Sequence, residues 1–174
     1  KPMIDSNDKV KPYFREARER GVKFDVGHGA GSFSFRIAKH AIEQGFAPDT
    51  ISTDMHTASI LVNQGTMPET MTKLLALGMG LNDIILRSTW IPAQTIGHPE
   101  LGNIGQTAFA DIAVLDIAEG NFGLTDNGSG NRSYPANKRI VCEMTVKNGQ
   151  VVWDRNARSR DPWTSTPPTN PLTV

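Results

Sequence analysis

The chain has 174 residues, of which 38% are hydrophobic, and this is enough for one domain with a buried core. Eighteen basic and eighteen acidic side chains cancel, so the overall charge does not indicate nucleic acid or an anionic membrane as a partner. No apolar run approaches the roughly 20 residues that span a bilayer. The single Cys142 excludes an internal disulfide and a multi-cysteine zinc site.

The first half of the chain predicts a strand–helix–strand unit. Residues 10–20 carry many charges and predict a surface helix. A strand over residues 22–26 follows, and after a glycine-rich turn comes a helix that Ser32 would cap and whose apolar residues recur at helical spacing. Residues 51–56 form the second predicted strand. In a barrel of parallel strands, reacting groups stand at the carboxyl ends of such strands.

Both predicted strands end in residues that can carry chemistry. His28 ends the first strand within its glycine-rich turn, and Asp54 and His56 end the second. We expect Asp54 and His56 on one face of the strand, because successive strand side chains point to opposite faces. A carboxylate at a strand end with histidines nearby is a candidate metal ligand and proton carrier. The alternative is that Asp54 only caps the segment that follows it.

The middle of the chain predicts a loop and two helices. Residues 57–65 are expected to form a flexible loop. The run Thr66-Met67-Pro68-Glu69 is a capping box with proline at an early helical position, and it predicts the start of a helix. A second helix is expected over residues 82–95.

The last third of the chain predicts short strands. Strands are expected over residues 110–116, 140–146 and 151–153. The intervening residues 118–137 are rich in Gly, Asn and Ser, and are expected to form a long irregular loop. Asn148-Gly149 is a strong hairpin-turn signal. The segment after Arg155 is rich in proline and small polar residues, which predicts an extended or disordered tail.

Three segments together resemble a known family. They are Asp-Val-Gly-His-Gly-Ala-Gly-Ser-Phe at 25–33, Ser-Thr-Asp-Met-His at 52–56 and Gly-Gln-Thr-Ala-Phe-Ala-Asp-Ile-Ala-Val-Leu-Asp at 105–116. The chain resembles the C-terminal portion of amidohydrolase-superfamily metallohydrolases of the amidohydrolase/deacetylase type, which are related to dihydroorotases and D-aminoacylases. The resemblance extends from about Val10 to Trp153.

The resemblance implies an α/β fold, namely the C-terminal part of a (β/α)8 TIM-like barrel followed by part of a small β-sandwich. Residues 1–97 would hold the last barrel strands and helices, with the two predicted strands as strands seven and eight. Residues 98–155 would be the C-terminal part of the β-sandwich, and residues 156–174 the tail. The family's other metal ligands, a His-x-His pair, a lysine and two further histidines, come from earlier strands. The chain is therefore expected to be a fragment that is inactive alone.

The resemblance also implies a function, the hydrolysis of C–N (amide) or ester bonds, as in a deacetylase of small acylated acids. Asp54 would bind one of one or two zinc ions, and would act as general base and then general acid for the metal-bound water. His28, Gly29 and His56 would contact the substrate, although His28 also has a purely structural interpretation. A homo-oligomer is left open. The compartment is left unknown, with the cytoplasm favoured, because N-terminal signals that would decide it would be missing from this sequence.

Two other interpretations remain open at the level of sequence. The chain could be a non-catalytic truncated barrel that serves as a binding or assembly module, because half-barrels leave strand edges and apolar faces uncovered. It could also belong to a cyclic amidase similar to dihydroorotase or allantoinase.

Overall fold

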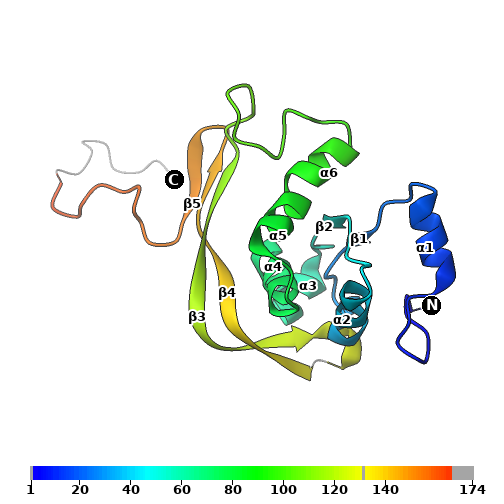
Figure 1. The fold of residues 1–174 in the computed structure, drawn as a ribbon. Coiled ribbons are helices and arrows are strands. Elements are labelled where there is room, and N and C mark those ends of the chain that lie inside the picture. Colours follow the sequence, from blue (N-terminus) through cyan, green and yellow to red (C-terminus); the bar gives the residue numbers. More distant parts are fainter. Residues whose placement is uncertain (1, 131, 166–174) are drawn as a thin grey trace.

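A computed structural model describes residues 2–130 and 132–165, and it shows a mixed α/β fold (Figure 1). The elements, in chain order, are α1 (Pro12–Glu19), β1 (Asp25–Val26), α2 (Phe35–Glu43), β2 (Thr50–Ile51), α3 (Thr57–Asn63), α4 (Met67–Ala76), α5 (Leu81–Ser88), α6 (Trp90–Thr95), β3 (Ile112–Asp126), the 3-10 turn η1 (Asn127–Ser129), β4 (Arg132–Lys147) and β5 (Gln150–Asp154). Helices α4 and α5 lie between the three-stranded sheet and the β1–β2 pair (Figure 1).

Strands β1 and β2 form a parallel pair that α2 connects, so the predicted strand–helix–strand unit is confirmed. Asp25 lies opposite Thr50, and Val26 lies opposite Ile51. Both strands are shorter than the sequence predicts. The second strand ends at Ile51, and the alternation expected over residues 51–56 is broken at Asp54, whose φ of 48° lies in the left-handed region.

Two predictions about helix starts in this region are wrong. The N-cap of α2 is Ser34 and not Ser32, because Phe33 and Phe35 on either side of Ser34 are both buried in the core. The expected loop over residues 57–65 contains α3. That helix begins where the Ser59 hydroxyl accepts a hydrogen bond from the His56 backbone N–H, at 2.8 Å, and so supplies a partner that the local sequence pattern did not suggest.

Helix α4 begins at the predicted cap, since the Thr66 hydroxyl accepts a hydrogen bond from the Glu69 N–H. The helix packs against β4, and residues 69–74 are all buried. The single helix expected over residues 82–95 is divided into α5 and α6 at Thr89. Pro92 explains the division, because proline has no N–H for an intrahelical bond and is tolerated only in the first turn of a helix.

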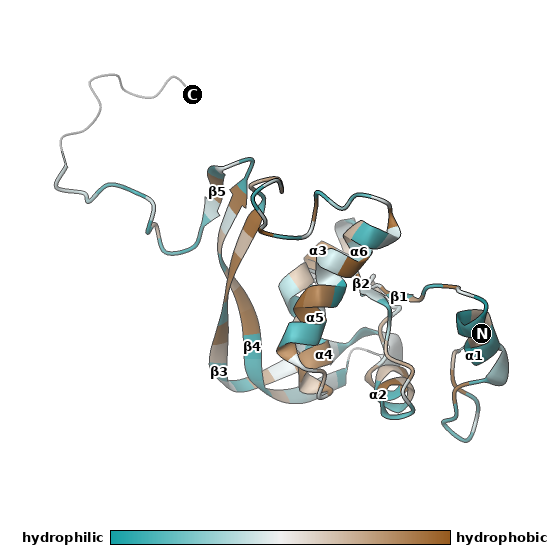
Figure 2. Ribbon diagram, turned by 45° about the horizontal axis from the view of Figure 1, so that its top comes forward, coloured by the Kyte–Doolittle hydropathy of each residue, from teal (hydrophilic) through white to brown (hydrophobic). Residues whose placement is uncertain are grey.

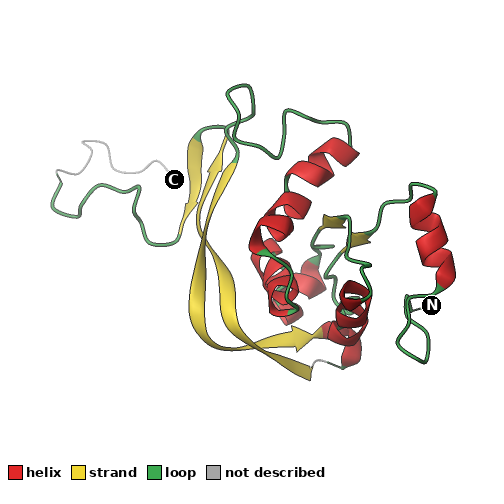
Figure 3. Ribbon diagram, in the orientation of Figure 1, coloured by secondary structure: helices red, strands yellow, loops and turns green. Residues whose placement is uncertain are grey.

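The three-stranded antiparallel sheet has the order β3–β4–β5 and runs along one side of the molecule (Figure 3). The irregular loop predicted over residues 118–137 is wrong, because β3 and β4 continue through most of it and pair from Ile112 with Val146 to Asp126 with Arg132. Irregularities in the register, one of them between Glu119 and Phe122, accommodate the small residues there. The predicted Asn148-Gly149 hairpin turn is confirmed.

The main hydrophobic core lies where α2, α4 and α5 meet the sheet. Its buried members are Phe33, Phe35, Ile51, Met71, Leu74, Met79, Ile84, Leu124 and Ile140. Figure 2 shows hydrophobic residues gathered along α5 and on β4. Across the two described ranges, every helix is too short or too polar to cross a bilayer. Of the predicted tail, residues 156–165 contain no helix or strand, and residues 166–174 lie outside the described residues.

Candidate active site

Asp54 lies in the segment that follows β2, at the carboxyl end of the parallel pair. Its left-handed backbone turns the exposed side chain out of the strand direction, and the carboxylate reaches toward the turn that follows β1. The two turns are joined by a backbone hydrogen bond of 3.0 Å, which the Gly29 N–H donates to the Thr53 carbonyl. Asp54 therefore stands where the ends of two parallel strands meet.

Two glycines leave room for the Asp54 side chain. A Cβ at Gly27 would lie 3.2 Å from Cβ of Asp54, and a Cβ at Gly29 would lie only 2.8 Å from Oδ2 of Asp54. Gly29 also has a φ of 52°, a conformation that side-chain-bearing residues rarely adopt. Both the backbone conformation and the available space therefore favour glycine at position 29.

His28 is completely buried, between the β1 end, α4 and the end of β3. Its Nε2 lies 2.6 Å from Nζ of Lys73, and its Nδ1 lies 2.9 Å from the Gly29 carbonyl oxygen. Burial lowers the pKa of His28 below 6.5, and the nearby charge of Lys73 acts in the same direction, although the bond to Gly29 opposes them. The imidazole is therefore held in its neutral form at neutral pH.

Lys73 supplies the charge beside His28, from the middle of α4. Its side chain is completely buried, and Nζ donates hydrogen bonds to the Thr125 carbonyl at 2.6 Å and to Oδ1 of Asn127 at 3.0 Å. Burial lowers the pKa of Lys73 from 10.5 to about 8, while the carboxylates of Glu69 and Asp126 raise it. The sequence pattern did not indicate Lys73 or Asn127 as site residues. The only signal was a lysine within the apolar run of α4.

His56 does not join this cluster. It is the exposed N-cap residue of α3, two residues beyond the left-handed turn at Asp54. The sequence predicted that Asp54 and His56 lie on the same face of one strand. That prediction is wrong, because β2 ends at Ile51 and no strand continues through residues 52–56.

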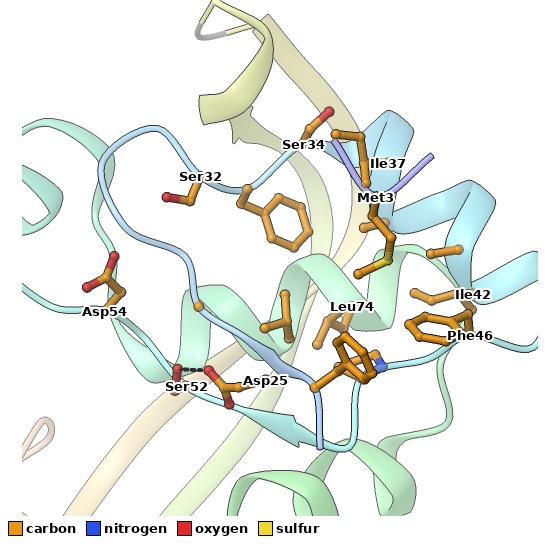
Figure 4. Close-up of a pocket in the computed structure, with 17 residues that line it drawn as sticks. Met3, Asp25, Ser32, Ser34, Ile37, Ile42, Phe46, Ser52, Asp54 and Leu74 are labelled. Carbon is orange, nitrogen blue, oxygen red and sulfur yellow. Dashed lines mark hydrogen bonds between the residues drawn. The ribbon is translucent and has the colours of Figure 1, made fainter. Parts of the chain in front are cut away.

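A cavity of about 620 Å³ lies beside the open edge of β1 (Figure 4). Most of its lining residues are apolar, and four of them come from α2, whereas Asp25, Ser32, Ser34, Ser52 and Asp54 contribute polar groups. The Asp25 carboxylate accepts hydrogen bonds from the hydroxyls of Ser52 and Thr50, the latter at 2.7 Å, so it is engaged in joining the two strands. Asp54 is the other carboxylate of this lining, and it lies beside the glycine turn.

The described residues do not supply a complete metal site. Within residues 2–130 and 132–165, no three His, Cys, Asp or Glu side chains come together in a way that could hold an ion. A single carboxylate, Asp54, fits a divalent metal only as one member of a larger ligand set.

Comparison with curated proteins shows several deacetylases that resemble this chain. Over 107 residues it is 35% identical to a deacetylase of Brucella anthropi, and the match covers 62% of this chain and 27% of that protein. It is also 34% identical to a deacetylase of Agrobacterium fabrum over 107 residues. That match covers 62% of this chain and 26% of the Agrobacterium protein. It is 30% identical over 154 residues to a deacetylase of Enterococcus faecalis. That match covers 86% of this chain and 40% of the Enterococcus protein. No model of a known protein family matches the sequence.

Solved structures extend the likeness to nearly the whole described fold. An adenine deaminase superposes with a TM-score of 0.75 and 31% identity, over 87% of this chain and 41% of that one. A dihydroorotase superposes with a TM-score of 0.68 and 26% identity, over 83% and 39%. The chain belongs to the amidohydrolase superfamily. It spans between about a quarter and two fifths of the length of its curated superfamily relatives.

Proposed function

We propose that this chain is part of a metal-dependent amidohydrolase that cleaves amide or ester bonds of small molecules, with Asp54 as the residue that handles protons. The observation that carries the proposal is the placement of Asp54. Its carboxylate stands at the shared carboxyl end of two parallel strands, and a glycine turn fixed to Thr53 leaves it space. In barrels of parallel strands this end is where reacting groups are displayed.

We infer further that β1 and β2 are strands seven and eight of a (β/α)8 barrel. The parallel pairing across α2 supports this, as does the superposition on the adenine deaminase and the dihydroorotase. The β3–β4–β5 sheet would then be the C-terminal share of the β-sandwich. We propose the division into residues 1–97, 98–155 and 156–174 on this basis, with β3, which begins at Ile112, inside the second part.

Asp54 would be one metal ligand in this proposal, with the remaining ligands supplied by residues outside this chain. A divalent ion, zinc in our proposal, lowers the pKa of water and polarises a carbonyl group. The Asp54 carboxylate would accept the proton of the attacking water and then donate it to the leaving amine or alcohol. Its exposure and its fixed backbone allow the carboxylate to face both groups in turn.

The proposed substrate contacts differ in how the structure supports them. Gly29 lies directly against the Asp54 carboxylate, and its lack of a side chain leaves room for that carboxylate. His56 is exposed two residues from Asp54, at the N-cap of α3, where it takes part in a capping box with Ser59. His28 is fully buried. In our proposal His28 therefore acts on the substrate indirectly, by supporting the Gly29 turn.

Deacetylation of small acylated acids is the favoured reaction, because three curated relatives carry the name deacetylase. Cyclic amide hydrolysis is the second candidate, and the superposition on a dihydroorotase supports it. A panel of N-acetyl and O-acetyl acids, assayed by acetate release beside dihydroorotate and allantoin, would separate the two reactions.

The test of Asp54 uses the intact protein that carries this chain. We expect Asp54→Asn to lower kcat by about 10²- to 10⁴-fold, the range typical of a lost general base or acid. Asp83→Asn is the matched control, because Asp83 is a carboxylate on α5 whose only ion pair among the described residues is with Arg87. Its turnover should stay normal. Normal turnover of Asp54→Asn would remove Asp54 from the mechanism.

A further inference from the structure

The contacts of Lys73 determine the protonation state of its neighbour. An ammonium group has three N–H donors and no acceptor. Around Nζ of Lys73 lie three acceptors, namely Nε2 of His28 at 2.6 Å, the Thr125 carbonyl at 2.6 Å and Oδ1 of Asn127 at 3.0 Å. Each N–H thus has its own partner. Because Nε2 of His28 accepts one of them, that nitrogen carries no proton.

The other ring nitrogen must then carry the proton. Nδ1 of His28 lies 2.9 Å from the Gly29 carbonyl oxygen, which is an acceptor. The same oxygen lies 3.3 Å from Nδ2 of Asn127, a second donor. The neutral Nδ1–H tautomer of His28 satisfies the contacts with Lys73 and the Gly29 carbonyl; Nδ2 of Asn127, which also lies 3.2 Å from Nδ1, then donates to the Gly29 carbonyl and not to the ring. The opposite tautomer would place an N–H against the ammonium of Lys73 and leave the Gly29 carbonyl with one donor fewer.

The Gly29 turn is consequently held from two sides. His28 and Asn127 donate to its carbonyl, and its N–H donates to the Thr53 carbonyl at 3.0 Å. The residue after Thr53 is Asp54, whose Oδ2 lies against Gly29. A contiguous series of hydrogen bonds therefore runs from α4 through the imidazole to the backbone beside the proposed proton carrier.

Stability alone does not account for a lysine at this position. None of its three hydrogen-bond acceptors is a carboxylate, so the charge is buried without a directly bonded counter-ion. Burying a charge in this way costs free energy, and an apolar residue of similar volume is often equally stable or more stable there. The network that Lys73 organises leads toward Asp54, which indicates a role in orientation.

We propose that Lys73 is a positioning residue, which locks His28 in the neutral Nδ1–H tautomer and thereby fixes the Gly29 turn against Thr53 and Asp54. The catalytic part of this proposal rests on the proposed function of Asp54, whereas the tautomer lock does not. Lys73 acts through His28 and touches neither the substrate nor the attacking water. Its effect is therefore expected on kcat and much less on KM.

The first experiment needs no variant. Nitrogen-15 NMR of the intact protein, with labelled histidine, reports which ring nitrogen of His28 is protonated. We expect a protonated Nδ1 and an unprotonated Nε2 at neutral pH. A protonated Nε2 would overturn the proposal outright, whatever the activity of the protein.

The second experiment replaces the lysine. In Lys73→Met the His28 signals should change to a mixture of tautomers, the Gly29 amide should exchange faster, and kcat should fall on the order of 10- to 100-fold, as is typical for residues that orient ligands. Thr72→Val is the matched control. Thr72 is equally buried on the same helix, and its hydroxyl bonds Ile140 and Pro68 without contacting His28. It should lose stability and keep the His28 signals and kcat.

A double-mutant cycle separates orientation from general damage. If Lys73 acts through His28, adding Lys73→Met to His28→Phe should lower kcat no further. Independent, multiplying effects would overturn the proposal, as would unchanged His28 signals in Lys73→Met. The proposed function fails separately, if Asp54→Asn keeps normal turnover. In that outcome a changed His28 tautomer in Lys73→Met would still support the lock.

Discussion

Nζ of Lys73 lies 2.6 Å from Nε2 of His28, and both side chains are completely buried. Two groups that can both be cations thus share one hydrogen bond in the interior, and only one of them can carry the charge. Desolvation lowers the pKa of each, while the acceptors around Lys73 suit an ammonium. The pair therefore consists of a charged lysine and a neutral histidine near pH 7. Through this pair, the free energy of unfolding should depend on pH both above and below pH 7.

On the alkaline side, we predict that Lys73 makes stability rise with pH. Its pKa is lowered from 10.5 to about 8 in the folded state. Between these values the unfolded chain binds a proton that the folded chain does not, so the free energy of unfolding increases with pH, by up to about 3 kcal/mol. Urea denaturation of the intact protein from pH 7.5 to 10.5 measures this. Lys73→Met lacks the titration and should lack the rise, and equal slopes would contradict the prediction.

On the acidic side, we predict a loss of stability that depends on His28. Its folded-state pKa is lowered below 6.5, mainly by burial. As the pH falls from 6.5 toward that lower value, the unfolded chain takes up a proton first, so the free energy of unfolding decreases. Thermal melts should show a steeper decline over this window for the native sequence than for His28→Phe. The exposed His98, which pairs with Glu100, provides the control. His98→Asn should keep the steep decline.

We predict that Gly29→Ala disturbs both folding and activity. A side chain at the left-handed φ of 52° costs about 1 to 2 kcal/mol, and its Cβ would lie 2.8 Å from Oδ2 of Asp54. The carboxylate must then move, so kcat should fall together with the melting temperature. Gly31→Ala is the matched control in the same turn, since a Cβ there would have no atom within 4 Å. Equal behaviour of the two variants would show that the space at Gly29 does not matter.

Local patterns predicted a large share of the fold. The capping box at Thr66 and the Asn148-Gly149 turn were predicted because their chemistry is confined to a few neighbouring residues. The strand–helix–strand unit was predicted from its alternating periods, and its strand ends indicated Asp54 as the candidate site residue. The exact first and last residues of the helices and strands were harder to predict from the sequence. Ser34 is the N-cap of α2 because Phe33 and Phe35 are buried in the core. Which of two nearby serines becomes the N-cap thus depends on tertiary packing.

The sequence by itself thus determined the superfamily resemblance, from three short segments, and the parallel strand–helix–strand unit with Asp54 after its second strand, since each of these patterns is local. Only the tertiary structure decided that residues 118–126 extend β3, because their strand conformation comes from pairing with β4. It alone brought Lys73 and Asn127, 45 and 99 residues away, onto His28. A buried lysine looks like a surface residue in sequence. Its hydrogen-bond acceptors can be identified only from the fold, in which α4, the glycine turn and the end of β3 pack together.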